Sequence, residues 1–138
     1  MKAPLFDKVL KLSQIIAQAS ADNNDQLRTD TVQKLQELCQ AHQGSAKDHP
    51  LQWEMLADFT NDGDLALDIY QIALDKAIKL ELVNANASIH LAMAQRYQEF
   101  GEHAKALAAA LQASELTDVL TNDDLKSEVN NFLSALVQ

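Results

Sequence analysis

Cys39, His42 and His49 form the closest group of soft metal ligands in this chain. Cys39 and His42 are three residues apart, which places them on one face of a helix. A structural zinc site takes four Cys or His ligands, and no fourth ligand lies at a suitable spacing. We therefore expect no metal and no other cofactor here, and we interpret Cys39 and His42 as members of an apolar packing stripe.

The acidic segment 58–65, which reads DFTNDGDL, is the second group of potential metal ligands. It matches a calcium-binding loop at the first, fifth, sixth and eighth positions. The twelfth position, where a Glu should contribute both carboxylate oxygens, is occupied by Ile69. Asn, Asp and Gly are equally typical of a turn that caps the following helix. We therefore predict a turn at residues 61–64, with Gly63 at positive φ, and no calcium site.

The potential catalytic groups are isolated from one another in the sequence. His90 and His103 belong to different predicted helices, and neither has a Ser, Cys or Glu at a spacing that forms a nucleophile or a general base. The sequence also contains no glycine-rich phosphate-binding loop. We predict no catalytic residue and expect a protein that is not an enzyme.

The composition indicates which elements position these residues. The 138 residues are 47% hydrophobic and 22% charged, with only three Gly and two Pro. All-β and disordered chains need many more turn-forming residues. Leu, Ala, Gln and Lys, which favour helices, are abundant instead. We predict one all-α domain over residues 1–138.

The charge and hydropathy of the chain restrict its partners and its location. The formal net charge of −9 opposes binding to nucleic acid, which requires Lys and Arg to neutralise phosphates. No apolar run approaches the length of about 18 residues that a membrane span needs. Asp7, Lys8 and Lys11 interrupt any signal-peptide core. We expect a cytoplasmic protein without nucleic acid or membrane partners, and the single Cys39 fits a reducing compartment.

Apolar residues recur at helical spacing in seven segments, which predict seven helices. The predicted helices run from Leu5 to Ser20, from Leu27 or Asp30 to Gln43, from Pro50 through Phe59, from Leu65 to Leu82, from a cap at Asn84 or Asn86 through Phe100, from Ala104 to Thr117, and from a cap at Thr121 or Asn122 through Leu136.

An internal repeat links the segments on either side of Gly63 and Gly101, which are 38 residues apart. The later unit carries Met93, Ala94, Tyr97, Gly101, Ala106, Leu107, Ala110 and Ala113. The earlier unit shows the same order with Met55, Leu56, Phe59, Gly63, Ala66, Tyr70, Ala73 and Leu74. This pattern resembles the tetratricopeptide repeat family, whose usual period is about 34 residues.

The resemblance implies a right-handed stack of antiparallel helix hairpins. Residues 1–49 would be a degenerate first pair, 50–83 and 84–118 two repeats, and 119–138 a capping helix. The first helices of the hairpins would line a concave groove. The residues expected in that groove are Trp53, Ala57, Thr60, Asn61, Ser88, Leu91, Gln95, Gln98 and Glu99.

A groove of this kind implies a protein interaction module that holds a peptide or helix of a partner, as an adaptor or small chaperone. Trp53 is either an anchor for that peptide or a wedge between hairpins. The many acidic residues either keep the surface solvated or complement a basic partner. The alternative is a structural protein that self-associates, for example as a homodimer, without a groove ligand.

Overall fold

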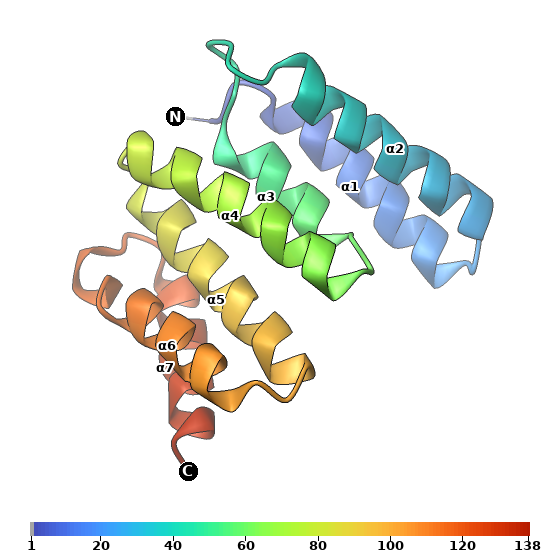
Figure 1. Ribbon diagram of the computed structural model, residues 1–138. Helices are drawn as coiled ribbons and strands as arrows, with labels where there is room; N and C mark the ends of the chain where they lie inside the picture. Colours follow the sequence, from blue (N-terminus) through green and yellow to red (C-terminus); the bar gives the residue numbers. More distant parts are fainter. Residues whose placement is uncertain (1) are drawn as a thin grey trace. The chain divides into compact units, whose positions relative to one another are not determined.

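The computed structural model describes residues 2–138, and the secondary structure of this part of the chain is entirely helical (Figure 1). This confirms the prediction of an all-α fold with about seven helices. The helices in the described chain are α1 (Phe6–Ala21), α2 (Asp25–Ala41), α3 (Pro50–Asp58), α4 (Gly63–Lys79), α5 (Val83–Glu99), α6 (His103–Ser114), the short 3-10 helix η1 (Thr117–Val119) and α7 (Asp123–Leu136).

The chain forms two compact units, residues 1–73 and residues 74–138, and the boundary falls inside α4. We refer to them as the first unit and the second unit. The single domain over 1–138 and its subdivision into 1–49, 50–83, 84–118 and 119–138 stay predictions, as does the right-handed stacking of hairpins.

In the first unit, α1 and α2 form an antiparallel hairpin, and α3 packs against both helices (Figure 1). Val9, Ile16 and Leu35 are at most 1% exposed, so the apolar stripes that predicted α1 and α2 face the interior. Cys39 is fully buried, and its thiol donates a hydrogen bond of 3.3 Å to the backbone carbonyl of Gln52 in α3. The thiol therefore joins α2 to α3 as part of the core.

In the second unit, α5 and α6 form a hairpin, and α7 contacts both helices. Ala94 in α5 and Ala106 and Ala110 in α6 belong to one core cluster and are at most 1% exposed. Small side chains at such positions let two helices approach closely. A second cluster includes residues of α5, α6 and α7 and consists of Ala87, Leu91, Ala113, Leu120, Leu125 and Val129.

Three turns between consecutive helices share one backbone geometry, with a residue at positive φ directly after the last residue that caps the helix. These residues are Asn23 (56°), Glu81 (55°) and Gly101 (75°). In each turn the next backbone N–H bonds to the carbonyl five residues earlier, which defines a Schellman motif. These bonds join Asn24 to Ala19 at 2.8 Å, Leu82 to Ala77 at 2.9 Å, and Glu102 to Tyr97 at 2.9 Å.

The turn before α4 differs from the prediction. Gly63 is the first residue of α4 and is not among the glycines at positive φ, so that prediction is wrong. The Asp62 side chain accepts the backbone N–H of Leu65 at 3.1 Å and caps the helix, as predicted for this segment. Because the cap directly precedes Gly63, the glycine is already inside the first turn of the helix and needs no left-handed backbone.

The start of α5 also differs from the prediction, because Leu82 and neither Asn84 nor Asn86 is the N-cap. Asn84 bonds instead to the segment before α7. Its Nδ2 donates to Oγ1 of Thr121 at 2.6 Å, and its Oδ1 accepts the backbone N–H of Thr121 at 3.1 Å. Helix α7 begins as predicted, since the Asn122 side chain accepts a backbone N–H of the first turn at 3.0 Å.

Candidate functional site

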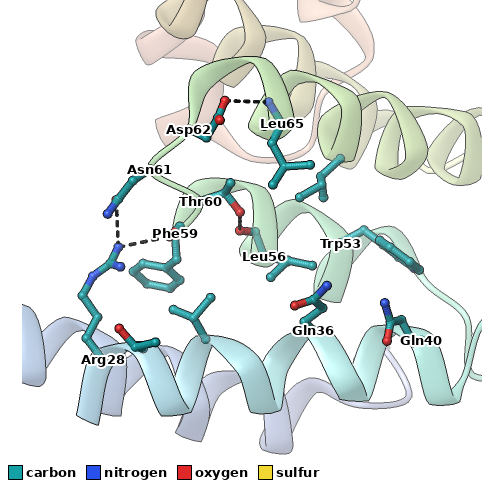
Figure 2. Close-up of a pocket in the computed structure, with 13 residues that line it drawn as sticks. Arg28, Gln36, Gln40, Trp53, Leu56, Phe59, Thr60, Asn61, Asp62 and Leu65 are labelled. Atoms are coloured by element: carbon teal, nitrogen blue, oxygen red, sulfur yellow. Dashed lines mark hydrogen bonds between the residues drawn. The ribbon is translucent and has the colours of Figure 1, made fainter. Parts of the chain in front are cut away.

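An open pocket of about 420 Å³ lies in the first unit between α2 on one side and α3 with the start of α4 on the other (Figure 2). We call it the α2–α3 pocket. Its lining residues are Arg28, Thr29, Val32, Gln36, Gln40, Trp53, Leu56, Phe59, Thr60, Asn61, Asp62, Leu65 and Ile69. A preformed concavity with apolar walls and a few polar groups is the usual form of a ligand site.

The α2 side of the pocket consists of residues spaced by four along one helix edge: Arg28, Val32, Gln36 and Gln40. This spacing places their side chains one above the other. Gln36 and Gln40 are exposed and rise from α2 towards α3 in Figure 2. The adjoining edge of α2 carries the buried residues of the core, so the pocket runs along the border between core and solvent.

The opposite side of the pocket is apolar. Leu56 and Phe59 point from α3 and its C-terminal end towards α2 (Figure 2), and Leu65 of α4 is 51% exposed. Trp53 lines the pocket as well, although its side chain is only 6% exposed. Its indole N–H donates to Oδ1 of Asp48 at 2.9 Å, which fixes the orientation of the ring.

Arg28 holds one end of the pocket together. Its Nη2 donates to the backbone carbonyl of Phe59 at 3.0 Å and to Oδ1 of Asn61 at 3.2 Å (Figure 2). Its Nε donates to the hydroxyl of Ser20 at the end of α1 at 3.1 Å. The guanidinium therefore fastens the α3–α4 connection to both helices of the first hairpin, which keeps the pocket in one shape.

Two of the three carboxylates of the calcium-like segment have structural partners. Asp62 caps α4, and Asp58 accepts a hydrogen bond from the hydroxyl of Tyr70. Thr60 donates its hydroxyl to the backbone carbonyl of Leu56 at 2.7 Å. Within residues 2–138 there is no group of three or more His, Cys, Asp or Glu side chains that could hold a metal ion. These contacts are those of a capped turn.

The two histidines of the first unit lie at the ends of helices. His42 is the C-cap of α2, whereas His49 is the N-cap of α3 and its Nδ1 accepts the backbone N–H of Leu51 at 3.1 Å. Burial lowers the pKa of His49 below its ordinary value of 6.5, and the neighbouring charge of Asp48 opposes that shift. The neutral ring, which can accept the capping hydrogen bond, is therefore favoured.

His90 in the second unit is also half-buried. Burial lowers the pKa of His90, while its hydrogen bond to the backbone carbonyl of Asn86 opposes the shift. Its Nδ1 lies 3.1 Å from that carbonyl oxygen and 2.8 Å from Oδ1 of the same residue. Both contacts lie within one turn of α5, so the ring has a local structural partner.

The structure brings together only some of the residues expected in the groove. Trp53, Thr60 and Asn61 meet in the α2–α3 pocket, whereas Ala57 is fully buried. In the second unit, Leu91 is 4% exposed within a core cluster, Ser88 is half-buried, and the exposed residues of α5 are Gln95, Gln98 and Glu99. Ala57 and Leu91 face the interior because their helix faces pack against neighbouring helices, so neither lines a groove.

The α2 side of the pocket was not predicted from the sequence. The tetratricopeptide resemblance predicted a groove lined by the first helix of each hairpin. The residues on the α2 side belong instead to the second helix of a hairpin: Arg28, Val32, Gln36 and Gln40. The signal available in the sequence was their spacing of four next to an apolar stripe, with one charged residue among them.

Comparison with protein-family models, with curated proteins and with solved structures found no match to this chain. Within residues 2–138, none of the helices has the length and apolar character required to cross a membrane.

Proposed function

We propose that this protein is a non-enzymatic interaction module of the cytoplasm that binds a segment of a partner protein in the α2–α3 pocket, as an adaptor or small chaperone. The observation that carries the proposal is the pocket itself, which combines exposed apolar area at Leu65 with the exposed amides of Gln36 and Gln40. Apolar anchors supply the binding energy of such sites, and polar groups fix the register of the ligand.

The chemistry of the lining favours binding over catalysis. The pocket is lined by aliphatic and aromatic side chains, amides, hydroxyls, Arg28 and Asp62. Arg28 is engaged with Phe59 and Asn61, and Asp62 caps α4. None of these groups forms the pair of a nucleophile and an adjacent base that covalent catalysis requires.

The architecture that we propose for this module is a stack of hairpins similar to tetratricopeptide repeats. Two features support this proposal. The turns at Asn23, Glu81 and Gly101 share one geometry, as expected for repeated hairpins. In the second unit the small residues of the repeat pattern, Ala94 and Ala106, are fully buried, as close helix packing requires.

Capture of partners from a lysate of the native host, followed by mass spectrometry, tests the function. Leu65→Asp places a charge in the pocket, and the matched control Leu111→Asp changes a side chain in the second unit that is 45% exposed, compared with 51% for Leu65. We expect a partner that wild type and Leu111→Asp retain and Leu65→Asp loses. A partner retained equally by all three proteins contradicts the proposed site.

Self-association is tested with the same variants by sedimentation across a range of concentrations. A dimer that forms without any captured partner, and that Leu65→Asp dissociates, would replace the proposed function with a structural role. A monomer at all concentrations supports the binding module.

A further inference from the structure

We infer that the ligand of the α2–α3 pocket is an extended peptide segment of about six residues in which apolar side chains alternate with basic ones. This inference rests on the proposed function and specifies the chemistry of the partner. It depends on three properties of the pocket: its length, its free amides and the charge of its rim.

The length and spacing of the α2 side match an extended chain. Arg28 and Gln40 are twelve residues apart on one helix, a distance of about 18 Å. An extended peptide advances about 3.3 Å per residue, so about six residues span this distance. The lining side chains of α2 repeat about every 6 Å, and alternate residues of an extended peptide repeat about every 6.6 Å. Peptide and helix edge therefore stay in register over the length of the pocket.

The amides of the pocket suit an extended backbone more than a helical one. A helix satisfies its own backbone groups internally, whereas an extended peptide presents N–H and C=O groups that need partners. Gln36 and Gln40 are exposed, and among the described residues neither side-chain amide has a hydrogen-bond partner. Each carboxamide both donates and accepts hydrogen bonds. Two such groups one helical turn apart can bond to alternate residues of an extended chain.

The floor of the pocket suits apolar side chains on one face of the peptide. Val32 and Phe59 are half-buried, and Leu65 remains 51% exposed. Alternate side chains of an extended peptide point to the same side. Placing these on Val32, Phe59 and Leu65 removes apolar area from water on both partners, which provides the main driving force for binding.

The rim of the pocket is acidic. On α4, Leu65 and Ile69 line the pocket, and Ala66 and Tyr70 on one side of them are buried. On the other side of Leu65 and Ile69, the neighbouring residues of α4 are Asp64 and Asp68, and both are exposed.

The α2 rim has the same sign of charge, since Glu37 is exposed beside Gln36. Asp62 lines the pocket itself, and the one basic lining residue, Arg28, is held by backbone and side-chain acceptors. Side chains that point outward from a bound peptide therefore lie beside acidic groups on both rims. Lys or Arg at those positions complements the rim and the net charge of −9.

The test uses four fluorescein-labelled probes and measures fluorescence anisotropy with the full-length protein. The first is a six-residue peptide in which Leu and Lys alternate. The second has the same composition in two blocks, the third replaces Lys with Glu, and the fourth is an amphipathic helix of Leu and Lys of about 14 residues. We expect the alternating Leu-Lys peptide to bind at least about tenfold more tightly than each of the other three.

Variants identify the groups involved. Replacing Gln36 and Gln40 together with Ala should weaken binding of the alternating peptide about tenfold, while Gln26→Ala on the same helix, outside the pocket, should leave it unchanged. Asp64→Asn and Asp68→Asn together should weaken binding and reduce its dependence on salt.

Three results would overturn the inference. Tighter binding of the helical probe excludes an extended ligand, and equal binding of the Leu-Glu peptide excludes the acidic rim as a determinant. If no probe binds although capture from lysate still depends on Leu65, the inferred ligand is wrong and the proposed function stands. Loss of both the probe binding and the Leu65-dependent capture contradicts the proposed function itself.

Discussion

The α5–α6 contact in the second unit is closed by small side chains, whereas the α2–α3 contact in the first unit is held open by large ones. Ala94, Ala106 and Ala110 fill the former and are at most 1% exposed. Leu56 and Phe59 face Gln36 across the latter, where a pocket of about 420 Å³ remains. The size of the side chains at a helix–helix contact thus decides whether the contact closes completely or leaves a pocket.

The connections between the helices reinforce this difference. The α5–α6 turn consists of Gly101 and two flanking residues, whereas the α2–α3 connection runs from residue 42 to residue 49. Asp48 organises this longer connection, because its Oδ2 accepts the backbone N–H of Gly44 at 2.9 Å and its Oδ1 accepts the indole N–H of Trp53.

The largest expected effect comes from enlarging a side chain in the closed contact. Ala110→Leu should lower the free energy of unfolding by about 3 kcal/mol, because the packed α5–α6 contact has no room for the added atoms. Chemical denaturation measures the change. Ala108→Leu on the exposed face of α6 is the matched control and should stay within about 0.5 kcal/mol of wild type.

The same enlargement in the open contact should be tolerated. Val32→Phe projects into the α2–α3 pocket, so its cost should be below about 1 kcal/mol while binding of the alternating peptide is lost. Similar destabilisation by Ala110→Leu and Val32→Phe would remove the distinction between the two contacts.

The second largest effect is expected for Arg28, which keeps the open contact in shape. Arg28→Ala removes three hydrogen bonds from a charged donor and should cost about 2 kcal/mol in thermal or chemical denaturation. Arg28→Lys should restore only part of this loss, because an ammonium group cannot reproduce the planar fork of a guanidinium. Lys34→Ala on the same helix is the control, and an equal cost for both Ala variants would show that Arg28 is not an anchor.

Substitutions at the left-handed turn residues should change stability through backbone strain alone. This effect should be the same in both units and independent of the helix–helix contacts. Asn23→Gly and Glu81→Gly should each raise the free energy of unfolding by about 0.5 kcal/mol, since glycine takes positive φ without steric cost. Gly101→Ala should lower it by about 1 kcal/mol, although a Cβ there meets no atom within 4 Å. Thermal melting compares the three variants, and destabilisation by Glu81→Gly would contradict the strain at this position.

The smallest expected effect is a dependence on pH at the start of α3. Because burial holds the pKa of His49 below 6.5, the unfolded chain binds a proton first as the pH falls. The contribution of the neutral ring is complete above about pH 6.5 and is lost as the pH falls towards the lower pKa of the folded state. His49→Asn keeps a capping acceptor that does not titrate, so the stability of this variant should decline less between about pH 7.5 and 5.5. An unchanged decline would exclude His49 as its source.

The comparison also shows which parts of the structure could be predicted from the sequence. Regular apolar stripes predicted the helices, and Gly101, which the repeat pattern singled out, takes the left-handed backbone that glycine accepts readily. The turn at Glu81 could not be predicted in the same way, since Glu carries no preference for positive φ and the surrounding helices impose it. Gly63 was misassigned because a cap residue and a turn glycine give similar local patterns.

The candidate site was harder to predict from the sequence because it depends on contacts between segments that are distant in the chain. Trp53, Thr60 and Asn61 lie close together in the sequence and were predicted together. Gln36 and Gln40 belong to α2, which a loop separates from α3. Only the packing of α2 against α3 shows that these two residues face Trp53, Thr60 and Asn61 across the pocket (Figure 2).

The shared turn geometry has a consequence for how turns are recognised in the sequence of a helical protein. Asn, Glu and Gly occupy the same left-handed position in three turns with the same hydrogen bond. The flanking helices therefore determine the turn, and a residue other than glycine at its centre costs only a modest amount of stability. Glycine content consequently underestimates the number of sharp turns in a helical chain, and a search for repeats that is anchored on glycine overlooks turns such as those at Asn23 and Glu81.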